Sequence, residues 1–262
     1  MTAIVVVAQP KYGLIHIATD AAIYTPEQDV VAFSGKTSTV PHWPGALTNV
    51  GSAAAHPLFA ASLAQGFDTF DELVSISESD LRDYTTTWGF PINAEVIIAG
   101  ISAQRGPEAY VFRTGELTAS AGRDEVPEYE DAPFRLVKLP DHVMTPVAND
   151  QVMVANYDGI DVSAPPEEVI WSMHKVLEMQ RSMILPPGVG AIGGFGSLTT
   201  ISADGISERI LCRWPEDQIG RSLRPSPTDW DQWHLDNPRP GSRLRQEIRA
   251  RKAQKSKLFR VK

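Results

Sequence analysis

Thr2 is the residue whose chemistry depends most on its position in the chain. A threonine hydroxyl is a weak nucleophile that needs an adjacent base. If Met1 is removed, the freed α-amino group of Thr2, with a pKa of about 7.7–8.0, can act as that base at neutral pH. While Met1 is attached, the same nitrogen is an amide and cannot accept a proton. The sequence therefore raises the hypothesis of a threonine nucleophile that carries its own base.

Other residues with catalytic or metal-binding chemistry are isolated in the sequence. We interpret His16, His56 and His174 as structural, because no H-x-x-x-H or similar spacing accompanies them. The single cysteine, Cys212, excludes an internal disulfide and a cysteine-rich metal site. The segment GVGAIGG at 188–194 precedes a strand pattern rather than a helix, which excludes a dinucleotide-binding turn.

Composition points to a soluble globular protein with one large domain and a tail. Of its 262 residues, 42% are hydrophobic and 21% are charged. The apolar runs at 3–8 and 95–100 are shorter than the roughly 20 residues of a membrane span. No basic segment precedes the first run, so we expect no secretory signal and a cytoplasmic location.

The charges are divided unevenly along the chain. Residues 239–262 hold ten Lys or Arg and one Glu, although the whole chain has a net charge of −8. The tail of a neighbouring subunit could pair with the acidic segment 115–133, or the tail could be a solvated, mobile terminus. Its only aromatic residue is Phe259, so stacking on single-stranded nucleic acid is weakly supported and nucleic acid is an unlikely partner.

Hydrophobic patterns predict strands first, then helices, strands, a long helix and strands. The expected strands are at 3–9, 13–20, 29–35, 45–51, 95–102 and 108–114, with two more within 190–214. The expected helices are at 52–66, at 70–89 with a break, and at 165–185. This order excludes regular βαβ alternation and favours an α+β fold with helices packed on antiparallel sheets.

The predicted domain covers residues 1–214. Within it, the Pro-rich and charged stretch 115–150 has no sustained period, so we interpret it as an irregular insertion. Residues 215–262 are predicted to be a basic C-terminal extension.

Several short motifs coincide with landmarks of one known family. Thr2 is followed by an apolar strand, a turn at Gly13 and the strand HIATD, which ends at Asp20. Lys36, in FSGKTST, lies sixteen residues beyond Asp20, and Gly51 stands where ALTNVG opens a helical run. The chain thus resembles the proteasome-type N-terminal nucleophile (Ntn) hydrolases, which include proteasome β subunits and simpler bacterial relatives. Segments further along the chain extend the resemblance over about 2–212.

The resemblance implies a four-layer α/β/β/α sandwich of antiparallel sheets and a threonine-type hydrolase of amide bonds, with a peptide as expected substrate. Thr2 would be nucleophile and base, and Lys36 would lower the pKa of its hydroxyl. Asp20 would hold Lys36, and the Gly51 N–H would stabilise an oxyanion. The family's habit of forming rings implies a homo-oligomer, and no metal or organic cofactor is implied.

The chain differs from the family in the polar residues that usually lie behind the nucleophile. Family members carry a D-x-x-S-G-G pattern, and aligning it with IGG at 192–194 places Val189 and Ile192 at the aspartate and serine positions. No Gly-Ser-Gly-like segment is found in 134–156 for a further serine. A catalytically silent structural or assembly component, whose basic tail binds a neighbouring subunit or an acidic partner, is therefore the alternative.

Overall fold

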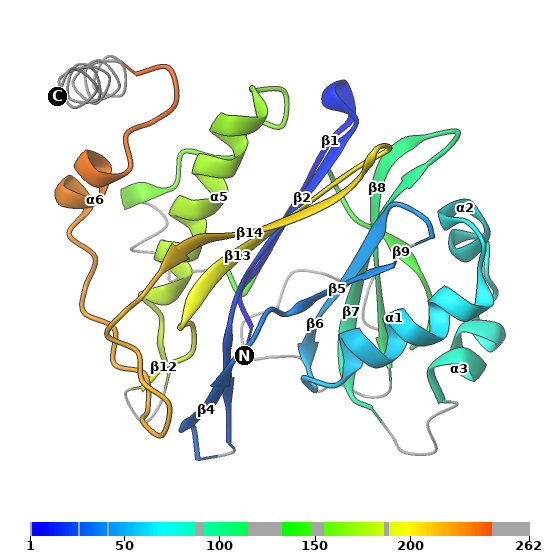
Figure 1. The fold of residues 1–262 in the computed structure, drawn as a ribbon, viewed down its shortest axis with the longest axis horizontal. Coiled ribbons are helices and arrows are strands. Elements are labelled where there is room, and N and C mark those ends of the chain that lie inside the picture. The colour runs from blue at the N-terminus through cyan, green and yellow to red at the C-terminus, as the bar shows by residue number, and fades with distance from the viewer. Residues whose placement is uncertain are drawn as a thin grey trace, which may run out of the picture.

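The computed structural model describes residues 2–25, 27–40, 42–86, 92–114, 133–147, 155–185 and 189–242. It combines antiparallel sheets with a few helices, which confirms the predicted α+β class (Figure 1). Among the described residues, no helix is long and apolar enough to cross a membrane.

The first five-stranded sheet has the order β10-β1-β2-β13-β14. Its strands are β1 (Ile4–Gln9), β2 (Leu14–Asp20), β10 (His142–Thr145), β13 (Phe195–Ser202) and β14 (Gly205–Arg213). A short 3-10 turn (Pro10–Tyr12) and Gly13, with a φ of 65°, join β1 to β2. The predicted hairpin at the start of the chain is therefore confirmed.

The second five-stranded sheet has the order β5-β6-β7-β8-β9. Its strands are β5 (Thr37–Val40), β6 (Gly45–Gly51), β7 (Ala94–Ser102), β8 (Gly106–Thr114) and β9 (Val137–Lys138). Two smaller pairs are β3 (Ala22–Tyr24) with β4 (Val30–Phe33), and β11 (Ile184–Leu185) with β12 (Val189–Gly190).

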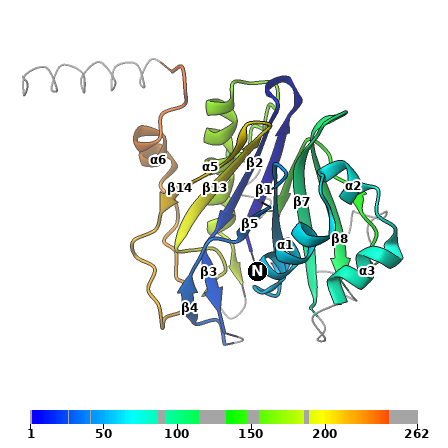
Figure 2. The same ribbon diagram turned by 45° about the vertical axis from the view of Figure 1, so that its right-hand side comes forward.

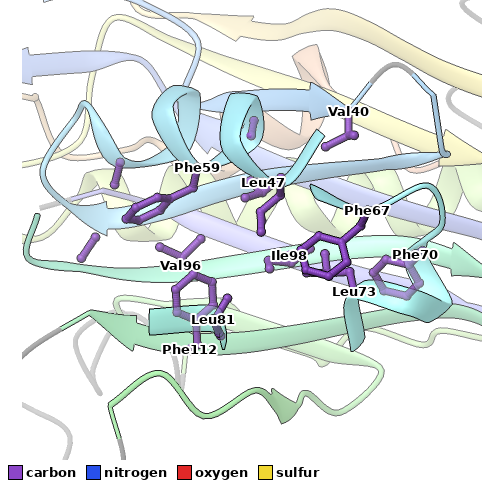
Figure 3. Packing of buried hydrophobic residues seen from close by; sticks show 14 of the residues in the cluster. Val40, Leu47, Phe59, Phe67, Phe70, Leu73, Leu81, Val96, Ile98 and Phe112 are labelled. Atoms are coloured by element: carbon purple, nitrogen blue, oxygen red, sulfur yellow. The ribbon is translucent and has the colours of Figure 1, made fainter. Parts of the chain in front are cut away.

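Helices lie on the outer faces of both sheets. The second sheet is covered by α1 (Ala55–Gly66), α2 (Phe70–Val74) and α3 (Glu78–Thr86), with Phe59, Leu81 and Phe112 in the shared core (Figure 3). The long helix α5 (Pro166–Arg181) packs on the first sheet through an apolar face that includes Met173 and Leu177. Figure 2 shows α5 beside β13 and β14 of the first sheet and α1 beside β7 of the second.

The strand β1 contributes side chains to two interiors, because successive residues of a strand point to opposite faces. Ile4 and Val6 join a core cluster with Ile97 of the second sheet, whereas Val5 and Val7 pack toward α5. This full burial explains why the segment IVVVA is apolar at every position rather than alternating.

Two predicted boundaries differ from the structure. Part of the expected irregular insertion, residues 133–147, contributes β9 and β10, and β10 pairs with β1; residues 115–132 and 148–150 lie outside the described residues. The chain also continues past Trp214 with packed structure, because Leu223 and Trp233 are buried and α6 (Trp230–Asp236) follows. The strongly basic end, 243–262, lies outside the described residues.

Candidate active site

The carboxylate of Asp20 is fully buried at the end of β2 and accepts four hydrogen bonds. Its Oδ1 accepts from the Ala3 N–H at 3.0 Å and from Lys36 Nζ at 2.8 Å. Its Oδ2 accepts from the N–H groups of Ala22 at 3.2 Å and Gly193 at 3.3 Å. Asp20 therefore ties together the first strand, the bend into β3, the segment before β5 and the turn before β13.

Lys36 lies between β4 and β5, and its side chain is only 9% exposed. Lys36 Nζ and the Ala3 nitrogen share one oxygen of Asp20, so they cannot be farther apart than the sum of those two hydrogen-bond distances. Thr2 is the residue directly before that nitrogen and is itself buried. The fold thus brings Asp20 and Lys36 together against the Thr2–Ala3 peptide.

Gly51 ends β6 with a φ of 108°, a conformation that L side chains rarely adopt. The next residue, Ser52, donates its N–H to Asn93 O of the neighbouring chain segment. Gly51 is paired with Ala94 of β7, and Thr48, three residues earlier in β6, is paired with Thr37 of β5. Because Thr37 directly follows Lys36, the end of β6 lies near the segment that carries Lys36.

Tyr24, which the sequence did not single out, also lies beside this ion pair. Lys36 Nζ is 5.8 Å from the centre of its ring. Its hydroxyl is buried and has no hydrogen-bond partner among the described residues. Burial raises the pKa of Tyr24, and the negative charge of Asp20 raises it further, so the hydroxyl stays protonated.

His56, interpreted from the sequence as structural, faces Ser38 at the start of α1. Its Nδ1 is 2.8 Å from Ser38 Oγ. Burial lowers the pKa of His56 to about 4, and the positive charge of Lys36 adds to this effect. An uncharged imidazole therefore lies within the electrostatic reach of Lys36 at neutral pH.

A buried ion pair holds the turn that donates to Asp20. Arg181 and Asp217 are 2.9 Å apart, Arg181 also donates to the Ile192 carbonyl at 2.9 Å, and Asp217 accepts from the Gly194 N–H at 2.7 Å. Gly193, which lies between Ile192 and Gly194 in the chain, donates its N–H to Asp20. The turn is thus fixed by the Asp20 carboxylate and by the Arg181–Asp217 pair.

Val189 and Ile192 supply no polar group near this turn. Both side chains are buried, and Ile192 belongs to the apolar core under α5. The polar support expected behind the nucleophile from the family pattern is therefore missing at these two positions.

A cavity of about 240 Å³ opens beside the chain segment that carries Lys36, although Thr2, Asp20, Lys36 and Gly51 are not among the described residues that line it. Gly35 and Thr37, the two chain neighbours of Lys36, line one part of it. The remaining lining residues come from β13 and β14: Phe195, Ser197, Thr199, Glu208, Arg209 and Ile210.

Comparison with known proteins returns no matching family model and no matching curated protein. The case for this site therefore depends on its geometry: a buried lysine and carboxylate beside Thr2, and a strand-end glycine near the segment that carries the lysine. Such a set can activate a hydroxyl and stabilise negative charge. Within the described residues, potential metal ligands gather on α5 and β14 and not here.

Proposed function

We propose that this chain is a threonine-type N-terminal nucleophile hydrolase that cleaves amide bonds, with a peptide as its substrate, after Met1 is removed. The observation that carries the proposal is the buried Lys36–Asp20 pair, 2.8 Å long, whose acceptor oxygen also binds the Ala3 N–H. The two stacked sheets between α5 and α1–α3 agree with the four-layer sandwich of that class, which is part of the proposal.

The proposed reaction uses the Thr2 amine as base. This amine takes the proton of the Thr2 hydroxyl, the oxygen bonds to the substrate carbonyl carbon, and the carbonyl electron pair moves onto its oxygen. The Gly51 N–H stabilises that oxyanion. The C–N bond then breaks, the leaving amine takes the proton from the Thr2 ammonium, and water hydrolyses the resulting ester by the same route.

Lys36 and Asp20 have supporting roles in this scheme. The positive charge of Lys36 favours the developing alkoxide and lowers the pKa of the hydroxyl. Asp20 neutralises and orients Lys36, whose burial as an unpaired cation would be costly. The three backbone donors to Asp20 hold its carboxylate in place.

Intact-mass measurement and labelling test the proposal. We expect the purified protein to lack Met1 and a β-lactone probe to acylate Thr2. Thr2→Ala should abolish labelling, and Lys36→Ala should slow it by about 100-fold or more. Lys11→Ala, which changes an exposed lysine, is the matched control and should label normally. Quantitative retention of Met1 would reject the proposal.

The buried apolar side chains of Val189 and Ile192 favour a second candidate, a catalytically silent assembly component. In that case a chain without Met1 stays unlabelled but still forms a homo-oligomer through its basic tail. Mass photometry of the full chain and of a chain ending at residue 242 tests the tail. Salt-sensitive assembly that is lost on truncation supports the second candidate only if labelling is also absent.

A further inference from the structure

Three potential metal ligands meet between α5 and β14. His174 and Glu178 are one helical turn apart on α5, and Cys212 lies near the end of β14. Their ligand atoms, an imidazole nitrogen, a carboxylate oxygen and the cysteine sulfur, all lie within 4.8 Å of one another. His174 Nε2 is 3.6 Å from Glu178 Oε1.

The Nε2 atom of His174 is a second observation that points to a binding site here. The residue is 9% exposed, and this nitrogen is buried without a hydrogen-bond partner among the described residues. At 3.6 Å, Glu178 is too distant to accept a hydrogen bond from it. A buried polar atom without a partner is costly, and a cation bound to its lone pair would remove that cost.

The donor types favour one class of cation. Nitrogen, oxygen and sulfur donors together suit Zn²⁺, whose tetrahedral bonds place neighbouring ligand atoms about 3.3–3.6 Å apart. The histidine–glutamate separation already fits that range. A contraction of about 1.2–1.5 Å would bring even a separation of 4.8 Å, the upper limit for the cluster, into the same range.

We propose that His174, Glu178 and Cys212 form a Zn²⁺ site that fastens α5 to β14. The fourth position is left for water or for the second carboxylate oxygen. The proposal is independent of the proposed hydrolase activity, because the cluster lies on the α5 side of the first sheet, within the core that includes Met173 and Leu177.

The surroundings of the site resemble those of a metal centre. Trp214 Nε1 donates to Glu178 Oε1 at 3.0 Å, which orients the carboxylate as outer-shell partners of metal ligands do. Trp233 of α6 packs edge-on against His174, with ring centres 5.2 Å apart, and shields it.

Cobalt substitution tests the site on the full chain, after treatment with a chelator and desalting. Co²⁺ should bind at one equivalent and give a near-ultraviolet thiolate-to-cobalt band, which can come only from Cys212 because the chain has one cysteine. Zn²⁺ should displace Co²⁺ and raise the melting temperature. Absence of the band, or of any change in melting temperature, would overturn the proposal.

Variants separate this site from binding at surface groups. Cys212→Ser should abolish the band, and His174→Asn or Glu178→Gln should weaken binding by more than about 100-fold, since each removes a ligand. Glu178→Gln retains an acceptor for Trp214, which favours folding.

Trp214→Phe should weaken binding about 10–100-fold, because it removes the donor that orients Glu178. His142→Asn, at an exposed histidine, is the control. Unchanged binding in both His174→Asn and Glu178→Gln would reject the assignment.

Discussion

Arg181 and Asp217 form an ion pair 2.9 Å long in which the side chains are only 4% and 2% exposed. The pair joins the last residue of α5 to the segment that follows Trp214. Because Asp217 also holds the Gly194 N–H, the C-terminal segment helps to position the turn that contacts Asp20.

Asp217→Asn should lower the free energy of unfolding by about 3–5 kcal/mol, because it leaves the Arg181 charge buried without its main partner. Chemical denaturation measures the effect. Glu216→Gln is the matched control: Glu216 also binds Arg181, at 2.7 Å, but is 51% exposed, so its loss should cost under about 1 kcal/mol. Equal losses in the two variants would contradict this account.

Gly51→Ala should destabilise the fold by about 2 kcal/mol or more, because alanine disfavours positive φ. In addition, its Cβ would approach Asn93 O to 2.6 Å. Gly35→Ala is the control, since a Cβ there meets nothing within 4 Å. Thermal unfolding compares the two variants. If Gly51→Ala is as stable as Gly35→Ala, the strand end is not constrained as described.

Asp20→Ala should destabilise the protein more than Lys36→Met. Removing the carboxylate leaves the buried ammonium of Lys36 and three backbone N–H donors without their acceptor, at a cost of about 3–5 kcal/mol. Removing the lysine leaves a carboxylate that those three N–H groups still stabilise. Urea unfolding of both variants gives the comparison. If Lys36→Met is the less stable variant, the lysine contributes more to the free energy of unfolding than the carboxylate does.

His16 predicts a loss of stability in acid. Burial lowers its pKa to about 4, with Arg209 adding to the effect, while the unfolded value is 6.5. The folded state therefore resists protonation, and its stability falls as the pH drops from 6.5 toward 4, by about 3 kcal/mol. His16→Asn should lose correspondingly less between pH 7 and pH 4, measured by denaturation at each pH. Parallel curves would exclude His16 as the cause.

The sequence predicted the elements whose pattern is local. The hairpin at the start of the chain is rich in β-branched residues and has Gly13 at its turn, and α5 carries one apolar face. The short strands β3, β5 and β10 were missed. Strands of three or four residues have little pattern of their own, and pairing partners far along the chain decide them.

The candidate site was predictable only in part for the same reason. The resemblance placed Lys36 and Asp20 in one region, and the structure brings them into contact. The Arg181–Asp217 pair and the cluster of His174, Glu178 and Cys212 depend on residues more than thirty positions apart. One signal was available: histidine and glutamate four residues apart on the strongest predicted helix, with a single cysteine in a later strand.

The segment after Trp214 also has a protective consequence for β4. Val30 donates its N–H to Arg221 O at 3.1 Å and accepts from the Gly220 N–H at 2.7 Å, and Asp29 forms a bridge with Ser222. These contacts cover backbone groups on the open edge of a two-stranded hairpin. An uncovered edge pairs readily with other chains, so a protein shortened to residue 214 would expose a template for aggregation. A fragment of this chain that resists aggregation must therefore extend past residue 222.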